Sequence, residues 1–155
     1  MLKASTNPEK SSRGEGPAGP VIRLVDVRKS FGAVKVLDGV NIEFERGKTT
    51  AIIGPSGVGK SVVLKHIVGL LKPDAGEIWM EDLRVDHLSE QDLVKMRTKI
   101  GFLFQMGALF DSMSVQDNIC FPLREHSRLA PNEQLERCEK VLLMVGLAGM
   151  GQKMP

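Results

Sequence analysis

The amino-acid sequence predicts an α/β fold with a parallel sheet at its core. Short runs rich in β-branched residues alternate with segments of helical periodicity, which is the order typical of parallel sheets. One such run, residues 49–53, is apolar on both faces, as strands inside a parallel sheet are. This run leads directly into a glycine-rich loop.

The composition is that of an ordinary soluble domain. Apolar residues make up 42% and charged residues 26% of the 155 residues, which excludes a disordered chain, a collagen-like repeat and a disulfide-rich mini-protein. The formal net charge of +2 and the scattered basic residues predict no nucleic-acid partner. No apolar stretch reaches the ~20 residues of a membrane span or follows a basic start, so we expect a cytoplasmic chain. We expect Cys120 and Cys138 to be reduced thiols packed as small apolar residues.

The first half of the chain is predicted to hold a tail, three strands and a helix. Residues 1–20 are rich in Pro, Gly, Ser and Thr and almost free of large apolar side chains, which predicts a flexible tail. β-Branched residues at 21–27 and clean alternation at 41–45 predict strands before the buried run at 49–53. A helix is expected over 60–71, where apolar residues recur at helical spacing until a turn with Pro and Gly.

The second half is predicted to continue the alternation. Strands are expected at 77–80 and 100–104. Ser89 can cap a helix whose first turn carries two acidic residues. Pro122 is expected to interrupt the next helical stretch, and Pro131 opens a last amphipathic helix.

A phosphate-binding loop is the most specific motif in the sequence. Residues 54–61 match the pattern G-x-x-x-x-G-K-S/T, for which this composition predicts only about 0.01 chance matches. Glycines permit the positive φ angles and the close backbone approach that a loop around a phosphate needs, and successive N–H groups at a helix N-terminus bind anions. Lys60 is expected to contact the β and γ phosphates, and Ser61 to complete a Mg²⁺ site. The predicted nucleotide-binding residues are Gly54, Pro55, Ser56, Gly57, Val58, Gly59, Lys60 and Ser61.

Residues 21–155 resemble the ATP-binding subunits of ABC transporters, which are P-loop NTPases. Besides the loop, the sequences KSFG at 29–32 and FLFQ at 102–105 carry this resemblance. It implies a P-loop core whose parallel sheet is incomplete, together with an antiparallel β subdomain. It also implies the start of a helical subdomain at about residue 106.

The resemblance assigns roles to two residues outside the loop. Phe31 stands where the family places an aromatic ring that stacks on adenine; the alternative for this residue is an ordinary place in the core. Gln105 stands where the family has a catalytic glutamine that reaches Mg²⁺ and the attacking water. ATP and Mg²⁺ are therefore the implied cofactors.

Within the family, the chain is most similar to the ATPases of MCE-associated phospholipid transport, the Mla type. The residues that carry this likeness are 54–79, 102–115 and 118–126, and Met106 departs from it because a small residue is expected there. The likeness implies ATP-driven phospholipid transport through a transmembrane permease subunit that docks on 106–126. It further implies a second ATPase copy in a homodimer, an MCE-type substrate-binding protein in the same complex, and a peripheral location on the inner face of the plasma (inner) membrane.

The signature helix, the Walker B strand and the switch histidine of the family do not follow Gln105 in these residues. Whether the chain hydrolyses ATP is therefore left open. Two alternatives to the phospholipid ATPase also stay open: an ABC ATPase for another solute, and a non-catalytic nucleotide-binding or permease-docking fragment of a broken gene. Without the strands that would flank it, the run 49–53 is expected to leave an apolar edge exposed.

Overall fold

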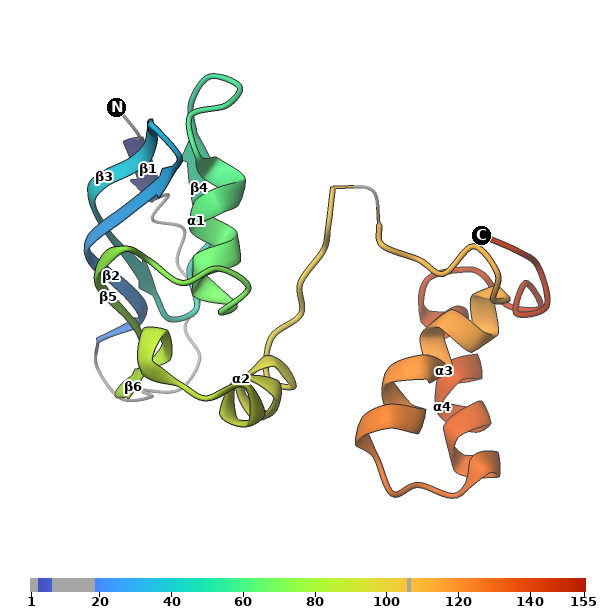
Figure 1. Ribbon diagram of the computed structural model, residues 1–155. Coiled ribbons are helices and arrows are strands. Elements are labelled where there is room, and N and C mark those ends of the chain that lie inside the picture. Colours follow the sequence, from blue (N-terminus) through green and yellow to red (C-terminus); the bar gives the residue numbers. More distant parts are fainter. Residues whose placement is uncertain (1–2, 7–18, 106) are drawn as a thin grey trace. The chain divides into compact units, whose positions relative to one another are not determined.

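The computed structural model describes residues 3–6, 19–105 and 107–155 and divides the chain into two compact units, residues 1–100 and 101–155 (Figure 1). In the described part of the chain, the sheets belong to the N-terminal unit and the C-terminal unit is helical. None of the helices described there is long and apolar enough to cross a membrane.

A four-stranded antiparallel sheet forms the body of the N-terminal unit. Its strands, in spatial order, are β3 (Val34–Glu45), β2 (Pro20–Phe31), β5 (Ala75–Met80) and β6 (Leu83–Arg84). The register places Leu24 opposite Ile42 on one side and Ile78 on the other, so these three apolar residues share one face of the sheet. β2 and β3 are longer than the sequence predicted, because the short turn Gly32–Ala33 joins them as a hairpin.

A second sheet pairs β1 (Lys3–Thr6) with β4 (Thr50–Ile53) in antiparallel register, from Lys3 opposite Ile53 to Thr6 opposite Thr50. This pairing corrects one expectation and bears on a second. Residues 3–6 form a strand rather than part of a flexible tail; residues 1–2 and 7–18 of the predicted tail lie outside the described residues. One edge of β4 is hydrogen-bonded to β1, but its other edge has no neighbouring strand in the described residues and Ile53 is 64% exposed, so the exposed apolar edge that was expected is present on that side.

Every strand pair in the described residues is antiparallel, so the parallel ladder predicted for the core is not formed there. The strand predicted at 100–104 is also wrong. This segment has no regular secondary structure, and Leu103 within it is 86% exposed. A strand requires a neighbour for its backbone N–H and C=O groups, and an apolar sequence pattern does not supply one.

The helices of the N-terminal unit are α1 (Lys60–Ile67), the 3-10 helix η1 (Val85–His87) and α2 (Glu90–Arg97). Ser89 caps α2 as predicted, because its Oγ accepts a hydrogen bond from the Asp92 N–H at 3.3 Å. α1 is shorter than predicted. Gly69 ends it, because its φ of +66° leaves the helical region and its N–H donates to the His66 carbonyl at 3.0 Å. The Arg97 guanidinium of α2 donates to the carbonyls of Val68 at 3.0 Å and Gly69 at 2.9 Å at this end.

The core of the N-terminal unit gathers apolar side chains from the four-stranded sheet and from the helices. The buried members are Leu24, Val27, Leu37, Ile42, Val63, Ile67, Ile78, Val85, Leu93 and Met96. Because α1 contributes Val63 and Ile67 to this core, the loop that precedes α1 is attached to a helix anchored in the core.

In the C-terminal unit, α3 (Val115–His126) packs on α4 (Pro131–Met144). Pro122 lies within α3 and does not end it, contrary to the prediction, because a proline removes a single N–H donor and packing can hold the flanking turns. Cys120 and Cys138 form a disulfide with their Cα atoms 5.9 Å apart, which corrects the expectation of two thiols. Both residues are buried as predicted, and burial on facing helices is what brings the sulfurs within bonding reach.

Candidate functional site

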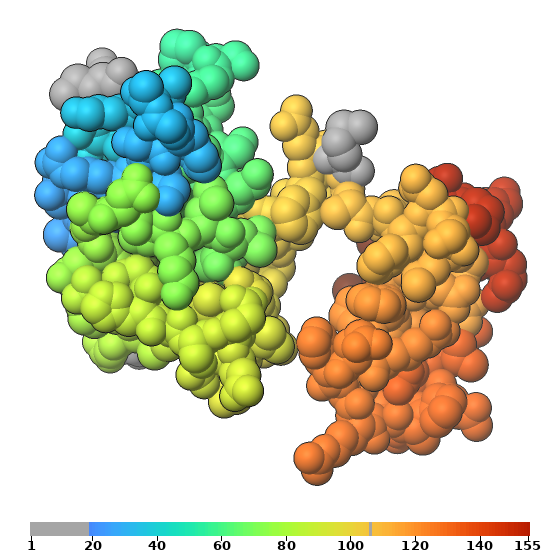
Figure 2. All heavy atoms as spheres, in the orientation of Figure 1, coloured from blue at the N-terminus to red at the C-terminus, as the bar shows by residue number. Residues whose placement is uncertain are grey.

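The predicted phosphate loop, residues 54–61, connects β4 to α1 and stands at the surface of the N-terminal unit (Figures 1 and 2). Gly57 and Gly59 have φ angles of +78° and +100°, in the left-handed region that favours glycine. A Cβ at Gly59 would also lie 3.0 Å from side-chain atoms of Val36 and Leu37 in β3. Glycine at 59 therefore serves both the backbone turn and a close contact between the loop and β3.

The Lys60 ammonium forms hydrogen bonds with the first residues of the loop. Its Nζ donates hydrogen bonds to the carbonyl oxygens of Gly54 at 2.9 Å and Pro55 at 2.8 Å. Both acceptors are neutral, so they orient the positive charge without cancelling it. An ammonium has three donors, which leaves Lys60 able to bind a further acceptor.

The N-terminus of α1 adds backbone donors to the same place. Within the described residues no side chain caps α1, and its first turn holds no acidic residue. The first N–H groups of a helix have no intrahelical acceptor, and the helix dipole places partial positive charge there. Ser61 in this turn has an exposed side chain. Amides, an ammonium and a hydroxyl of this kind fit a polyphosphate anion and its divalent cation.

Phe31 is the last residue of β2, and its side chain is 46% exposed, so it does not belong to the buried core. It pairs with Val34 across the hairpin, two residues before the Val36 that contacts Gly59 of the loop. The Lys29 ammonium lies over the Phe31 ring, 5.8 Å from its centroid. The structure thus presents an exposed aromatic ring at the end of β2, in the hairpin whose other strand, β3, lies against Gly59 of the phosphate loop.

Asp74 is a residue of this region that sequence reasoning missed. Its Oδ1 accepts a hydrogen bond from Lys29 Nζ at 2.7 Å, and its Oδ2 accepts one from the Ser30 N–H at 2.7 Å. The hydrogen bond from Lys29, followed by that from Ser30, lowers the pKa of Asp74 below its usual value. In the sequence Asp74 is an ordinary turn residue between Pro73 and Ala75, and nothing local signals its partners.

His66 is a buried polar residue on α1, the helix that follows the loop. Its Nδ1 lies 2.7 Å from the Val62 carbonyl oxygen, so this nitrogen carries the proton and donates it. Its Nε2 is buried without a hydrogen-bond partner in the described part of the chain. Burial lowers the pKa of His66 below its ordinary value.

The predicted catalytic residue Gln105 belongs to the C-terminal unit, where its side chain is exposed. Met106, beside it, lies outside the described residues. Further along this unit, Phe110 packs against Phe121 with ring centroids 4.9 Å apart and ring planes tilted by 54°, and Asn118 hydrogen-bonds both the N–H and the carbonyl of Phe110. The segment predicted to dock on a permease therefore presents an ordered aromatic pair.

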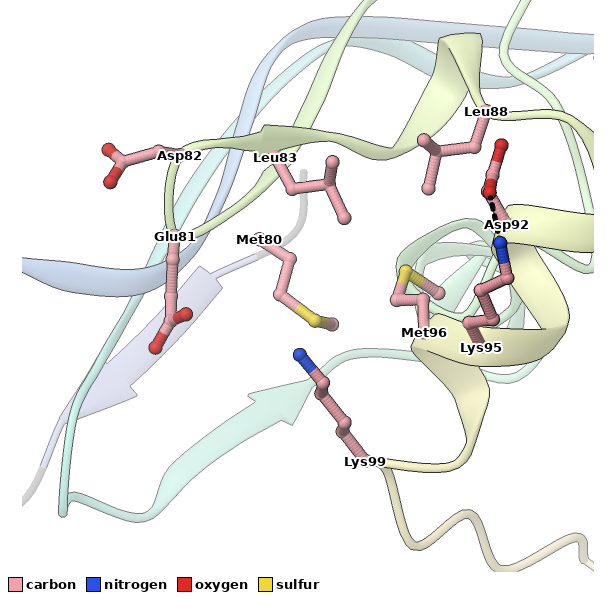
Figure 3. Close-up of a pocket in the computed structure, with 9 residues that line it drawn as sticks. All are labelled: Met80, Glu81, Asp82, Leu83, Leu88, Asp92, Lys95, Met96 and Lys99. Atoms are coloured by element: carbon pink, nitrogen blue, oxygen red, sulfur yellow. Dashed lines mark hydrogen bonds and ion pairs between the residues drawn. The ribbon is translucent and has the colours of Figure 1, made fainter. Parts of the chain in front are cut away.

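A cavity of about 540 Å³ lies between the β5–β6 hairpin and α2 (Figure 3). Its floor is apolar and comes from Met80, Leu83, Leu88 and Met96. The charged residues at its rim have both signs, and Asp92 and Lys95 pair with each other at 3.1 Å. Because these charges offset one another, the cavity favours no single charge of ligand, and the phosphate loop remains the candidate site.

Comparisons with known proteins identify the family of the chain. The sequence profile of the ABC transporter family matches residues 37–155. The intermembrane phospholipid transport system ATP-binding protein MlaF of Haemophilus influenzae is 42% identical over 120 residues, which cover 77% of this chain and 46% of that protein. The probable ribonucleotide transport ATP-binding protein mkl of Mycobacterium leprae is 39% identical over 142 residues, which cover 92% of this chain and 41% of that protein.

Among solved structures, a dimeric ATP-binding cassette in a post-hydrolysis state, bound to ADP and Pi, matches with a TM-score of 0.75 at 29% identity. The match covers 86% of this chain and 61% of that chain. The chain spans less than half the length of the two relatives described above, 41% and 46%.

Proposed function

Because this chain belongs to the ABC transporter family, whose ATP-binding cassettes share the predicted P-loop fold with an antiparallel β sheet, we propose that residues 54–61 bind the phosphates of ATP with Mg²⁺. The larger protein of which such a cassette forms part couples ATP hydrolysis to transport. The C-terminal unit is, in this proposal, the beginning of the helical subdomain.

The geometry of the loop is the single observation that carries the proposal. Positive φ angles at Gly57 and Gly59 turn the backbone toward an uncapped helix N-terminus, and the charge of Lys60 is held beside it by neutral oxygens. Backbone amides and the ammonium would bind the phosphate oxygens. The Ser61 hydroxyl would hold Mg²⁺ together with phosphate oxygens. The cation supplies charge that stabilises the transferred phosphoryl group.

Two residues outside the loop complete the proposed ATP site. Phe31 stacks on the adenine ring; its exposure and its place on the hairpin that touches the loop through Val36 support this role. Gln105 orients the attacking water and contributes to the Mg²⁺ site, a role supported by its position in the FLFQ sequence alone.

Phospholipid is the cargo we propose, on the likeness to MlaF at 42% identity. The partners are then a transmembrane permease subunit, a second copy of the ATPase, and an MCE-type substrate-binding protein, at the inner face of the plasma (inner) membrane. The dimeric state of the matching solved cassette supports the second copy. The Phe110–Phe121 pair supplies an apolar element for docking on the permease.

Transport of another solute is the second candidate. It is favoured by the likeness to mkl, whose name refers to ribonucleotide transport and which matches a longer part of this chain than MlaF does. Neighbouring genes that encode an MCE-domain protein would favour phospholipid. A neighbouring gene for a periplasmic receptor of a small polar solute would favour the alternative.

ATP binding is tested by titration calorimetry on the 155-residue chain, with Lys60→Ala as the key variant. Removing one charge-assisted contact should weaken ATP about ten- to 150-fold. Lys65→Ala is the matched control, because Lys65 is an exposed lysine on the same helix. Equal ATP affinity of the wild type and the Lys60→Ala chain would contradict the proposal, provided that both give the same far-ultraviolet circular dichroism.

A further inference from the structure

The turn after α1 is bonded to the end of β2 through one residue, Asp74. Its N–H donates to the Arg28 carbonyl at 2.9 Å, and its carboxylate accepts from the Ser30 N–H and from Lys29 Nζ, both at 2.7 Å. Three consecutive residues of β2 are therefore bonded to a single aspartate. All three precede Phe31 directly.

These bonds are made where β2 has lost its neighbour on one side. The pairing of β2 with β5 ends at Arg28 opposite Ala75, the residue after Asp74. On the other side, the register with β3 shifts between Lys29 and Ser30. The Asp74 carboxylate takes up the Ser30 N–H at this point, and so supports the strand for two residues beyond the end of the ladder.

Lys29 contacts both Asp74 and the Phe31 ring. Its ammonium bonds Asp74 and lies over Phe31, 5.8 Å from the ring centroid, while the Lys29 side chain is only 17% exposed. A cation over one face of an aromatic ring is attracted by the ring electrons. One face of Phe31 is thus covered by Lys29, and the partly exposed ring offers a flat apolar surface for a base.

We propose that Asp74 is a positioning residue for nucleotide binding: through Lys29 and Ser30 it fixes the end of β2 and the Phe31 ring in the orientation that stacks on the base. The inference rests on the proposed ATP site and adds to it a residue that does not touch the nucleotide. It predicts a selective defect. Loss of Asp74 weakens the contact with the base and leaves the contacts with the phosphates intact.

The experiment compares two ligands on the full chain, ATP and inorganic tripolyphosphate, by titration calorimetry in the presence of Mg²⁺. Asp74→Ala should weaken ATP at least about fivefold, as loss of a stacking contact does, and change tripolyphosphate by less than about twofold. Phe31→Ala should give the same pattern. The double variant should be no weaker than Phe31→Ala alone, because both changes remove one interaction.

Asp74→Asn serves as the conservative variant, since it keeps an acceptor for the Ser30 N–H but loses the charge that holds Lys29. It should bind ATP with an affinity between those of the wild type and Asp74→Ala. Asp82→Ala is the matched control, because Asp82 is an exposed aspartate in another turn of the same unit. It should bind both ligands as the wild type does.

Four results would overturn the inference, and each can be told from the others. Equal losses for ATP and tripolyphosphate in both Asp74 variants would show that Asp74 supports the fold as a whole. An unchanged ATP affinity in Asp74→Ala, with a loss in Phe31→Ala, would show that the ring needs no support from Asp74. An unchanged ATP affinity in Phe31→Ala, or a wild type that binds neither ligand, would remove the proposed adenine or phosphate site itself and the inference with it.

Discussion

His66 places a titratable ring where a charge would be poorly solvated. The ring is buried on α1, its Nε2 has no partner in the described residues, and Lys29 of β2 adds repulsion that Asp74 only partly offsets. Because burial lowers the pKa of His66 in the folded chain, the unfolded chain, with an ordinary histidine pKa of about 6.5, binds more protons below that pH. The stability that His66 contributes as a neutral ring is therefore present above about pH 6.5 and lost as the pH falls through the lowered value.

We predict that the free energy of unfolding falls between pH 7 and 5, and that His66→Phe makes this fall smaller while leaving stability at pH 7.5 equal or higher. The phenyl ring has a similar shape and leaves no buried nitrogen without a partner. Urea unfolding at pH 7.5, 6 and 5 measures the effect. His126→Phe, at an exposed position, is the control, and a pH dependence that is the same in all three proteins would contradict the prediction.

Gly76 is the second residue of β5 and lies against β2 where the register between the two strands shifts, between Val25 and Arg28. Its φ is +91°, and a Cβ there would meet the Asp26 carbonyl oxygen at 2.4 Å and that of Val25 at 2.6 Å. Gly76→Ala should therefore destabilise the chain by about 3–4 kcal/mol. Gly47→Ala separates the two causes, because Gly47 has a φ of +70° with nothing within 4 Å and should cost only about 1–2 kcal/mol. If urea unfolding shows the same loss of unfolding free energy for both variants, the backbone of β2 moves to make room for the added Cβ and the predicted steric cost is absent.

At the scale of elements, the pair α3–α4 depends on a covalent bond as well as on packing. The Cys120–Cys138 disulfide closes a loop with a sequence separation of 18 residues, which restricts the unfolded chain. We predict that dithiothreitol lowers the free energy of unfolding by about 3 kcal/mol, and that a Cys120→Ala/Cys138→Ala chain is indifferent to the reductant. Two thiols that react with an alkylating reagent in the unreduced, unfolded chain would contradict this.

The elements that the sequence predicted well are those with local signals. The Ser89 cap, the glycine-rich loop and the periodicity of α1 and α4 all act within a few residues. The sequence could not predict features that depend on distant partners. Asp74 is bonded to Lys29 over a separation of 45 residues, the β1–β4 pairing joins segments separated by more than 40, and the segment 100–104 fails to be a strand because no neighbour pairs with it.

At the scale of the whole molecule, the proposed transport function depends on what the C-terminal unit presents to its partner. The Phe110 side chain is 45% exposed and packs against the Phe121 ring. The Phe110 N–H donates a hydrogen bond to the Asn118 side chain. In the full transport ATPase, we predict that Phe110→Asp abolishes co-purification with the permease, because a carboxylate cannot be buried in an apolar contact. ATP binding should be unchanged.

The matched control for this variant is Met144→Asp, since Met144 is 84% exposed at the end of α4 in the same unit. It should leave the complex intact. Retained co-purification of a folded Phe110→Asp protein would show that the aromatic pair serves packing within the C-terminal unit and not docking.

The strand β1 couples the predicted phosphate loop to the N-terminal residues of the chain. Its pairing with β4 ends at Lys3 opposite Ile53, one residue before Gly54 begins the loop. This pairing spans only four residues on each strand. We therefore expect it to open at a lower free-energy cost than the rest of the unit. Each opening frees the edge of β4 for the same strand of a neighbouring molecule. Strand exchange between chains should therefore rise with protein concentration. Proteolytic removal of the first residues should promote self-association and weaken the proposed binding of phosphate.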